Sequence, residues 1–223
     1  TLDAARAAWT AARPSYLVTE AFRFYDGPIE AVEGELNAWP MNEAFVDYTT
    51  GAPKGGLIND PAFQATAETI LARNQASDEA DVTTGWHAIE FLLWGQDLHG
   101  TGPGAGERPY TDYDTANCTN GHCDRRAQYL KAASSLLVSD LEEMVGNWKA
   151  DGAARKGLVD GEVNAGLSTI LTGMGSLSYG ELAGERMKLG LILHDPEEEH
   201  DCFSDNTPIS HLNDAIGIRD AYH

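Results

Sequence analysis

Basic residues, cysteines and long apolar runs are all scarce in this sequence. There are 15 Lys and Arg residues against 35 Asp and Glu residues, so the formal net charge is −20. Such a charge argues against nucleic acid and against an anionic membrane surface as partners, because both are polyanions. No apolar run reaches the ~20 residues that a membrane-spanning helix needs. We therefore expect no transmembrane segment in this chain.

Only three cysteines are present. Cys118 and Cys123 enclose a polar turn rich in Asn and Gly, with His122 as the single nearby imidazole. A zinc knuckle needs more Cys or His at matching spacing. We therefore predict a disulfide that closes a small loop, which implies an oxidising compartment. Cys202 is then left as a small buried thiol.

Several catalytic motifs are also missing. The sequence contains no Gly-x-Ser-x-Gly elbow, so a nucleophilic hydrolase is poorly supported. The glycine-rich residues 102–106 lack the Lys-Ser/Thr pair of a phosphate-binding loop. No His-Glu-x-x-His occurs, and Glu90 is followed by Phe91 where one zinc-peptidase pattern has His. Peptidase chemistry would thus need metal ligands recruited from elsewhere in the chain.

Helical periodicity is what the sequence does contain, and strand-like alternation is absent. The prediction is an all-α fold, an up-and-down helical bundle with long irregular loops. Loops are expected over 25–40, 51–60 and 99–123, which are rich in Gly and Pro. Helices are expected over 2–12, 16–24 (kinked or restarted by Pro14), 42–48, 61–74 (with Asp60 as cap), 85–95, 124–150, 161–193 and 209–223.

The stretch from Trp86 to Trp94 stands out because every residue in it except His87 and Glu90 is apolar. A helix that is apolar around its whole circumference belongs inside a bundle. His87 and Glu90 are three residues apart and so share one face of that helix. A buried carboxylate costs several kcal/mol unless something pairs with it. This position therefore requires a partner for Glu90.

Two interpretations of that pair remain open. One is a hydrogen-bonded His–Glu pair that fixes helix packing. The other is half of a metal site, with a nitrogen and an oxygen ligand supplied from one helical turn. His87 lies in the first turn, where the helix dipole disfavours imidazolium and leaves a nitrogen lone pair free to ligate.

Gly85-x-His87-x-x-Glu90, continuing through Phe91-Leu92-Leu93-Trp94-Gly95, resembles the signature of the imelysin-like family. These are bacterial envelope proteins associated with iron uptake and also catalogued as metallopeptidases. Residues 20–28, 106–113 and 200–207 are similar to the family as well, so the resemblance covers nearly the whole chain. It implies an imelysin-like bundle over residues 1–194. Residues 195–223 are then expected to be an acidic loop and the start of a second helical bundle that is truncated here.

The resemblance also implies a metal site. In the iron-uptake relatives, carboxylates from neighbouring helices complete the site with the His-x-x-Glu pair. The candidate ligands are therefore His87, Glu90, Glu20 and Asp47. Imidazole with several carboxylates suits iron, zinc or manganese; the resemblance favours iron, with zinc as the alternative.

The expected function follows from these features. The resemblance implies a periplasmic or outer-membrane-anchored protein that binds a metal ion or a small metal-bearing ligand. A role in iron uptake or homeostasis is expected, with an envelope protein as a further partner. Two alternatives stay open: a metal-dependent peptidase, and a structural or partner-binding bundle in which His87 and Glu90 only lock helices together.

Overall fold

The computed structural model describes residues 1–223, apart from the side chain of Glu197. Helices joined by long loops make up the fold, and the described chain contains no strand, which confirms the all-α bundle. The α-helices are α1 (Leu2–Leu17), α2 (Glu30–Leu36), α3 (Glu43–Val46), α4 (Ala67–Leu71), α5 (Gly85–Trp94), α6 (Cys123–Trp148), α7 (Ala153–Val159), α8 (Val163–Gly175), α9 (Leu189–Leu193) and α10 (Thr207–Tyr222).

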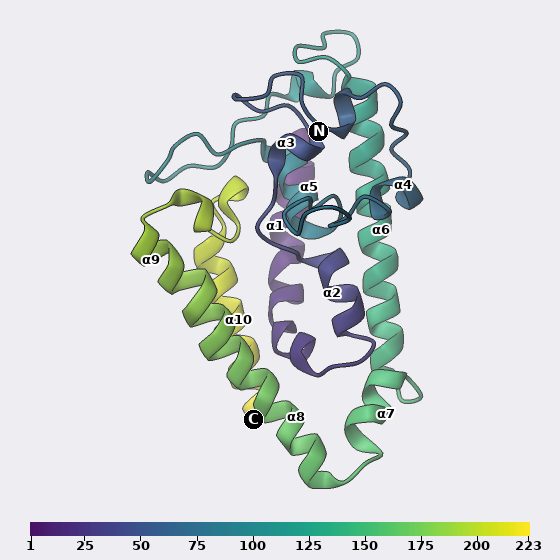
Figure 1. The fold of residues 1–223 in the computed structure, drawn as a ribbon, viewed down its shortest axis with the longest axis vertical. Helices are drawn as coiled ribbons and strands as arrows, with labels where there is room; N and C mark the ends of the chain where they lie inside the picture. The colour runs from purple at the N-terminus through teal and green to yellow at the C-terminus, as the bar shows by residue number, and fades with distance from the viewer.

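Helix α5 lies at the centre of the fold, and every one of its residues is buried. It packs against α1 and α6 (Figure 1). Its first residue, Gly85, has a φ of +81°, and a Cβ there would lie 2.3 Å from the carbonyl oxygen of Leu36. Only glycine fits that approach. The expected fully apolar helix is confirmed, and Gly95 ends it with a φ of +73°.

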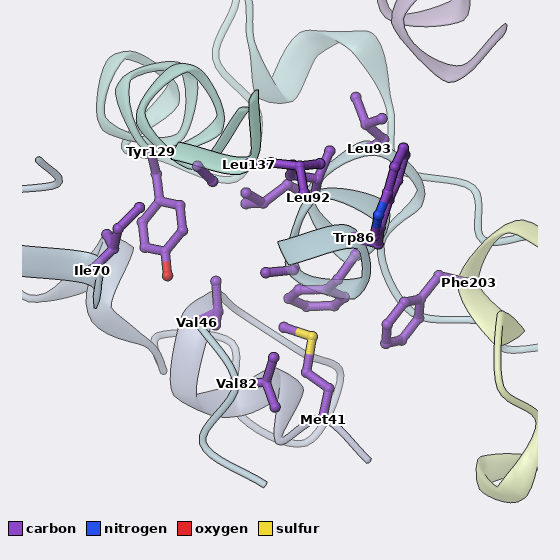
Figure 2. Close-up of a cluster of buried hydrophobic side chains, with 14 of the residues drawn as sticks. Met41, Val46, Ile70, Val82, Trp86, Leu92, Leu93, Tyr129, Leu137 and Phe203 are labelled. Atoms are coloured by element: carbon purple, nitrogen blue, oxygen red, sulfur yellow. The ribbon is translucent and has the colours of Figure 1, made fainter. Parts of the chain in front are cut away.

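The hydrophobic core surrounds α5 (Figure 2). Trp86, Leu92 and Leu93 contribute from α5, while Phe203 arrives from the far end of the sequence. The hydroxyl of Tyr129 on α6 donates to the carbonyl of Thr83 over 2.9 Å, so this buried phenol keeps a hydrogen bond. Burying each such aromatic side chain stabilises the fold by about 1.5–3 kcal/mol. The core thereby fixes where the polar residues of α5 point.

A long helical run packs against α10, which in turn packs against α1. Helix α8, the π-helical segment Ser176–Lys188 and α9 follow one another without a break. Helix α10 packs beside this run and against α1, while α6 lies on the opposite side with α2 between (Figure 1). Whether residues 195–223 begin a second bundle stays a prediction; here they contact α1 and the 3-10 helix Glu20–Phe24.

Two predicted elements were wrong. Residues 25–40, expected as a loop, contain α2. The helix expected over 61–74 shrinks to α4, which Thr66 caps through a capping box with Thr69. This cap satisfies the first backbone amides of α4, so the helix begins at Ala67 rather than after the Asp-Pro pair at 60–61. Pro14 lies inside α1 without ending the helix.

The short 3-10 helices position loops around the core. They span Glu20–Phe24, Leu57–Asn59, Tyr110–Asp112, Pro196–Glu198 and Cys202–Ser204. The acidic run 195–201 therefore includes helical turns, and its Glu197 side chain lies outside the described residues.

The cysteine prediction is confirmed. Cys118 and Cys123 form a disulfide that closes the small loop before α6, and Cys202 is a buried thiol outside it. The bond is compatible with an oxidising compartment. Throughout the described residues, no helix is both long and apolar enough to cross a bilayer.

Candidate metal centre

Helix α5 places His87 and Glu90 one turn apart, facing the same way. Nδ1 of His87 lies 3.0 Å from Oε2 of Glu90, and both side chains are fully buried. The core on the remaining faces of α5 leaves these two as its only ionisable groups. Their spacing therefore produces the paired imidazole and carboxylate that the sequence predicted.

The segment before α10 brings a second histidine and a second carboxylate to this pair. Oδ1 of Asp201 lies 3.6 Å from Nδ1 of His87, and the ring centroid of His200 lies 4.7 Å from that of His87. Ser204 donates from its backbone N–H (2.9 Å) and its hydroxyl (2.6 Å) to Oε1 of Glu90. This gives Glu90 the partner that its burial requires.

Helix α1 adds a guanidinium group. Nη2 of Arg13 donates to Oδ1 of Asp201 over 2.8 Å and lies 3.5 Å from Nε2 of His87. Arginine can only donate, so Nε2 of His87 accepts from it only in the tautomer that carries the ring proton on Nδ1. In the other tautomer Nδ1 accepts from the protonated carboxyl group of Glu90. His87 thus has a polar neighbour at each ring nitrogen.

Burial controls the ionisation of this group. It lowers the pKa of His87 to about 3, helped by the nearby charge of Arg13, so the imidazole is neutral. Burial and the charge of Asp201 raise the pKa of Glu90 well above its usual range. Burial alone would also raise the pKa of Asp201, but the charge of Arg13 outweighs it and lowers that pKa to about 2. Asp201 is therefore the fixed negative charge.

The pKa of His200 is also lowered, well below its ordinary value, first by burial and then by the charge of Arg186. The ring is therefore neutral, with a lone pair on one nitrogen. Its Nε2 is buried and has no hydrogen-bond partner within the described part of the chain. A buried polar atom left in this way costs about 1–3 kcal/mol unless something binds it.

Three of these side chains form a group that could hold a metal ion. His87, His200 and Asp201 each offer one ligand atom, and these atoms all lie within 4.8 Å of one another. All three are buried, and Glu90 adjoins them. Two imidazoles with one or two carboxylates match the ligands that iron and zinc take in proteins. The residues present fit such an ion, and the orphaned nitrogen of His200 is consistent with one.

One comparison with known proteins identifies the family of this chain. The model of the imelysin family, which is named as a peptidase family, matches residues 1–223. The chain belongs to the imelysin family. A search of curated proteins gives no match. Membership confirms the resemblance to the family, and imelysins are envelope-associated proteins.

In this imelysin, Glu20 lies close to the group without joining it. Its Oε2 accepts from Nη2 of Arg186 over 2.6 Å, and its Oε1 accepts from Nδ2 of Asn37 over 3.2 Å. Asn37 in turn accepts from Arg13 over 2.7 Å. Burial would raise the pKa of Glu20, but the charge of Arg186 outweighs it and lowers that pKa. The structure therefore connects Glu20 to the centre through Asn37 and Arg13.

Asp47 lies in a different cluster. Its carboxylate accepts from Nη1 of Arg108 over 2.8 Å and from Nε of Arg126 over 2.6 Å. Both guanidinium groups are buried, and Arg108 also contacts Asp112 at 3.1 Å. The structure does not bring Asp47 to His87 and Glu90; it joins the loop after α3 to α6.

Sequence reasoning missed three residues of the centre: His200, Asp201 and Arg13. The first two end an acidic run that was interpreted as a loop, yet they are 3% and 0% exposed. The available signal was the adjacent Cys202-Phe203, an apolar pair that has to be buried and carries its neighbours inward. Arg13 gave a comparable signal, because it lies one turn after Trp9 and one turn before Leu17, on the helix face that the core covers.

Proposed function

We propose that this imelysin is an envelope-associated protein that binds a metal ion through His87, His200 and Asp201, with Glu90 as a fourth ligand. Iron is favoured and zinc is the alternative. The observation that carries the proposal is the buried group of two neutral imidazoles and an ionised carboxylate whose ligand atoms lie within 4.8 Å of one another. Imelysin membership supports the assignment.

The charges of the group support a cation. Asp201 is ionised, and Glu90 supplies a second carboxylate on loss of its proton, against the single guanidinium of Arg13. With both carboxylates ionised the group carries a net charge of −1, which attracts a cation, and metal binding would release the proton of Glu90. Arg13 and Ser204 would keep their roles, the first orienting Asp201 and the second orienting Glu90.

A purely structural role is the first rival. In that case the same hydrogen bonds only fix α5 against α1 and the segment before α10. Nε2 of His200 has no hydrogen-bond partner among the described side chains, which favours the metal, since a structural network gains nothing from leaving it unsatisfied.

A metal-dependent peptidase is the second rival, supported by the name of the family. Such chemistry needs an open coordination position and a base beside the metal-bound water. Here the side chains of His87, Glu90 and Asp201 are all fully buried. The burial of the group favours binding over peptide cleavage.

The physiological role follows from the family and the compartment. We propose a function in iron uptake or homeostasis, in the periplasm or on an outer-membrane anchor. Support comes from the Cys118–Cys123 disulfide, which suits an oxidising compartment, and from the envelope association of imelysins. Either the bare ion or a small metal-bearing ligand is the proposed partner, with an envelope protein as a further one.

Metal analysis of variants tests the proposal. Protein purified without a metal-affinity tag is stripped, reloaded with ferrous iron or zinc, and analysed for metal content. We expect one ion per chain in the wild type, and at least about tenfold weaker binding in His87→Ala and in His200→Ala, since each loses a ligand. The matched control is His99→Ala, which removes an exposed histidine. Wild-type protein that binds neither metal would reject the proposal in favour of the structural rival.

A further inference from the structure

A cavity of about 790 Å³ lies between α1, α2 and α6. Its volume is within the range of small-molecule sites. Its walls are mainly apolar and include Tyr16, Leu36, Trp86, Met144 and Trp148. Within the described structure, none of the four proposed metal ligands lines it. The cavity is therefore separate from the metal centre.

One end of the cavity is polar and acidic. Glu20, Arg23 and Glu33 line it. Arg23 is shared among three carboxylates, since its Nη1 lies 3.1 Å from Glu33, 3.6 Å from Glu181 and 3.7 Å from Glu20. Glu20 and Glu181 also pair with Arg186, at 2.6 and 3.2 Å. Of these three carboxylates, Glu33 thus has the fewest positively charged partners, since only Arg23 pairs with it.

Two buried polar atoms at this cavity lack hydrogen bonds. Oε1 of Glu33 accepts no hydrogen bond from the described residues, although Nη1 of Arg23 lies 3.1 Å from it as an ion-pair partner. The indole Nε1 of Trp86 likewise has no acceptor in the described structure, although Trp86 is only 5% exposed. Burial raises the pKa of Glu33, which the charge of Arg23 only partly opposes. A donor bearing positive charge would satisfy the carboxylate.

We propose that this cavity binds an amphiphilic organic amine, with its ammonium group donating to Glu33 and its apolar body packed on Trp86 and Trp148. Aromatic walls favour this class of ligand, because the faces of Trp and Tyr attract cations. The net charge of −20 attracts cations to the chain as a whole. The mouth is formed by the exposed residues Ala12, Val145 and Lys149, so the ligand enters between α1 and α6.

Calorimetric titration of metal-free protein at neutral pH tests this site independently of the metal proposal. The probes are naphthylethylamine and its uncharged analogue naphthylethanol. We expect the amine to bind at one site at least about tenfold more tightly than the alcohol, the gain of a charge-assisted hydrogen bond. Equal affinities, or no binding of the amine, would overturn the proposal.

Two variants locate the binding. Glu33→Gln keeps the shape of the side chain and should abolish the preference for the amine. Ala12→Trp narrows the mouth from an exposed position and should abolish binding of both probes, whereas Ala11→Trp is the control, since Ala11 is exposed and does not line the cavity. Undiminished amine affinity in Glu33→Gln or in Ala12→Trp would place the binding elsewhere and refute this site.

Discussion

His87 and Glu90 occupy one turn of α5 with Nδ1 and Oε2 3.0 Å apart, and neither side chain is exposed. Each side chain also has polar partners outside the helix: Arg13 and Asp201 contact His87, and Ser204 donates a hydrogen bond to Glu90. The pair is thus the meeting point of three segments that are far apart in the sequence. Substitutions at these residues therefore distinguish a loss of metal binding from a loss of folding stability.

The two carboxyl groups of the centre should differ in their effect on stability. Glu90 has a raised pKa, so Glu90→Gln resembles its protonated form and should cost less than about 1.5 kcal/mol, the scale of one hydrogen bond. Asp201 is ionised against Arg13, so Asp201→Asn leaves a buried guanidinium unpaired and should cost about 3–5 kcal/mol. Urea unfolding of metal-free protein at neutral pH measures both free energies. Equal costs would contradict this assignment of charge.

Asp47 should prove important for stability and irrelevant to metal. Asp47→Asn weakens the pairing of Arg108 and Arg126, both buried, and should reduce the free energy of unfolding by about 3–5 kcal/mol. Metal content should stay at the wild-type level, because Asp47 does not reach His87. Asp3→Asn, at a side chain that is 91% exposed, is the control. Loss of metal from folded Asp47→Asn protein would restore Asp47 as a ligand.

Asp140 on α6 should make stability fall as the pH rises. Burial, with the charges of Glu35 and Glu143, raises its pKa to about 6, and its Oδ2 has no partner in the described structure. Between about pH 4 and pH 6 the carboxyl group is therefore protonated in the folded state but ionised in the unfolded state, whose pKa is near 3.9. Stability falls across this range as the pH rises. Asp140→Asn should stabilise the protein by about 1 kcal/mol at pH 8, with no gain below about pH 4. Thermal unfolding across that pH range checks the sign; a variant less stable at pH 8 would contradict it.

No peptide-bond cleavage is expected from this chain with added zinc or ferrous iron. Glu90 is held by Ser204 and would be a ligand, so it is not available as a base for a metal-bound water. The measurement is release of new amino termini from a denatured protein substrate. Cleavage that is abolished by Glu90→Gln and by a chelator would favour the peptidase rival.

The sequence predicted those helices whose own apolar residues show the helical pattern without reference to the rest of the chain. Helix α5 was predicted because Trp86 to Trp94 leave no face for solvent, and α6 because its apolar positions recur over seven turns. Helix α2 was missed because Gly34 and the flanking Gly27 and Pro40 mark a loop, whereas packing against α5 and α6 holds the short helix. Local propensity is a weak guide where tertiary contacts decide.

The metal centre was only half predictable for a related reason. His87 and Glu90 lie one helical turn apart, and this proximity can be recognised in the sequence from their spacing of three residues. His200 and Asp201 reach them through the fold, across more than a hundred residues, and no local spacing encodes that approach. Glu20 and Asp47 were chosen by resemblance to the family; both are buried, but the nearby arginines decide where a buried carboxylate pairs.

X-ray absorption at the metal edge tests the central claim most directly, because it counts the imidazoles bound to the ion. Iron- or zinc-loaded wild-type protein should show two imidazole ligands together with oxygen donors. His200→Ala should show one imidazole, and His99→Ala should still show two. A wild-type spectrum without imidazole scattering, or an unchanged count in His200→Ala, would contradict a metal centre built from His87 and His200.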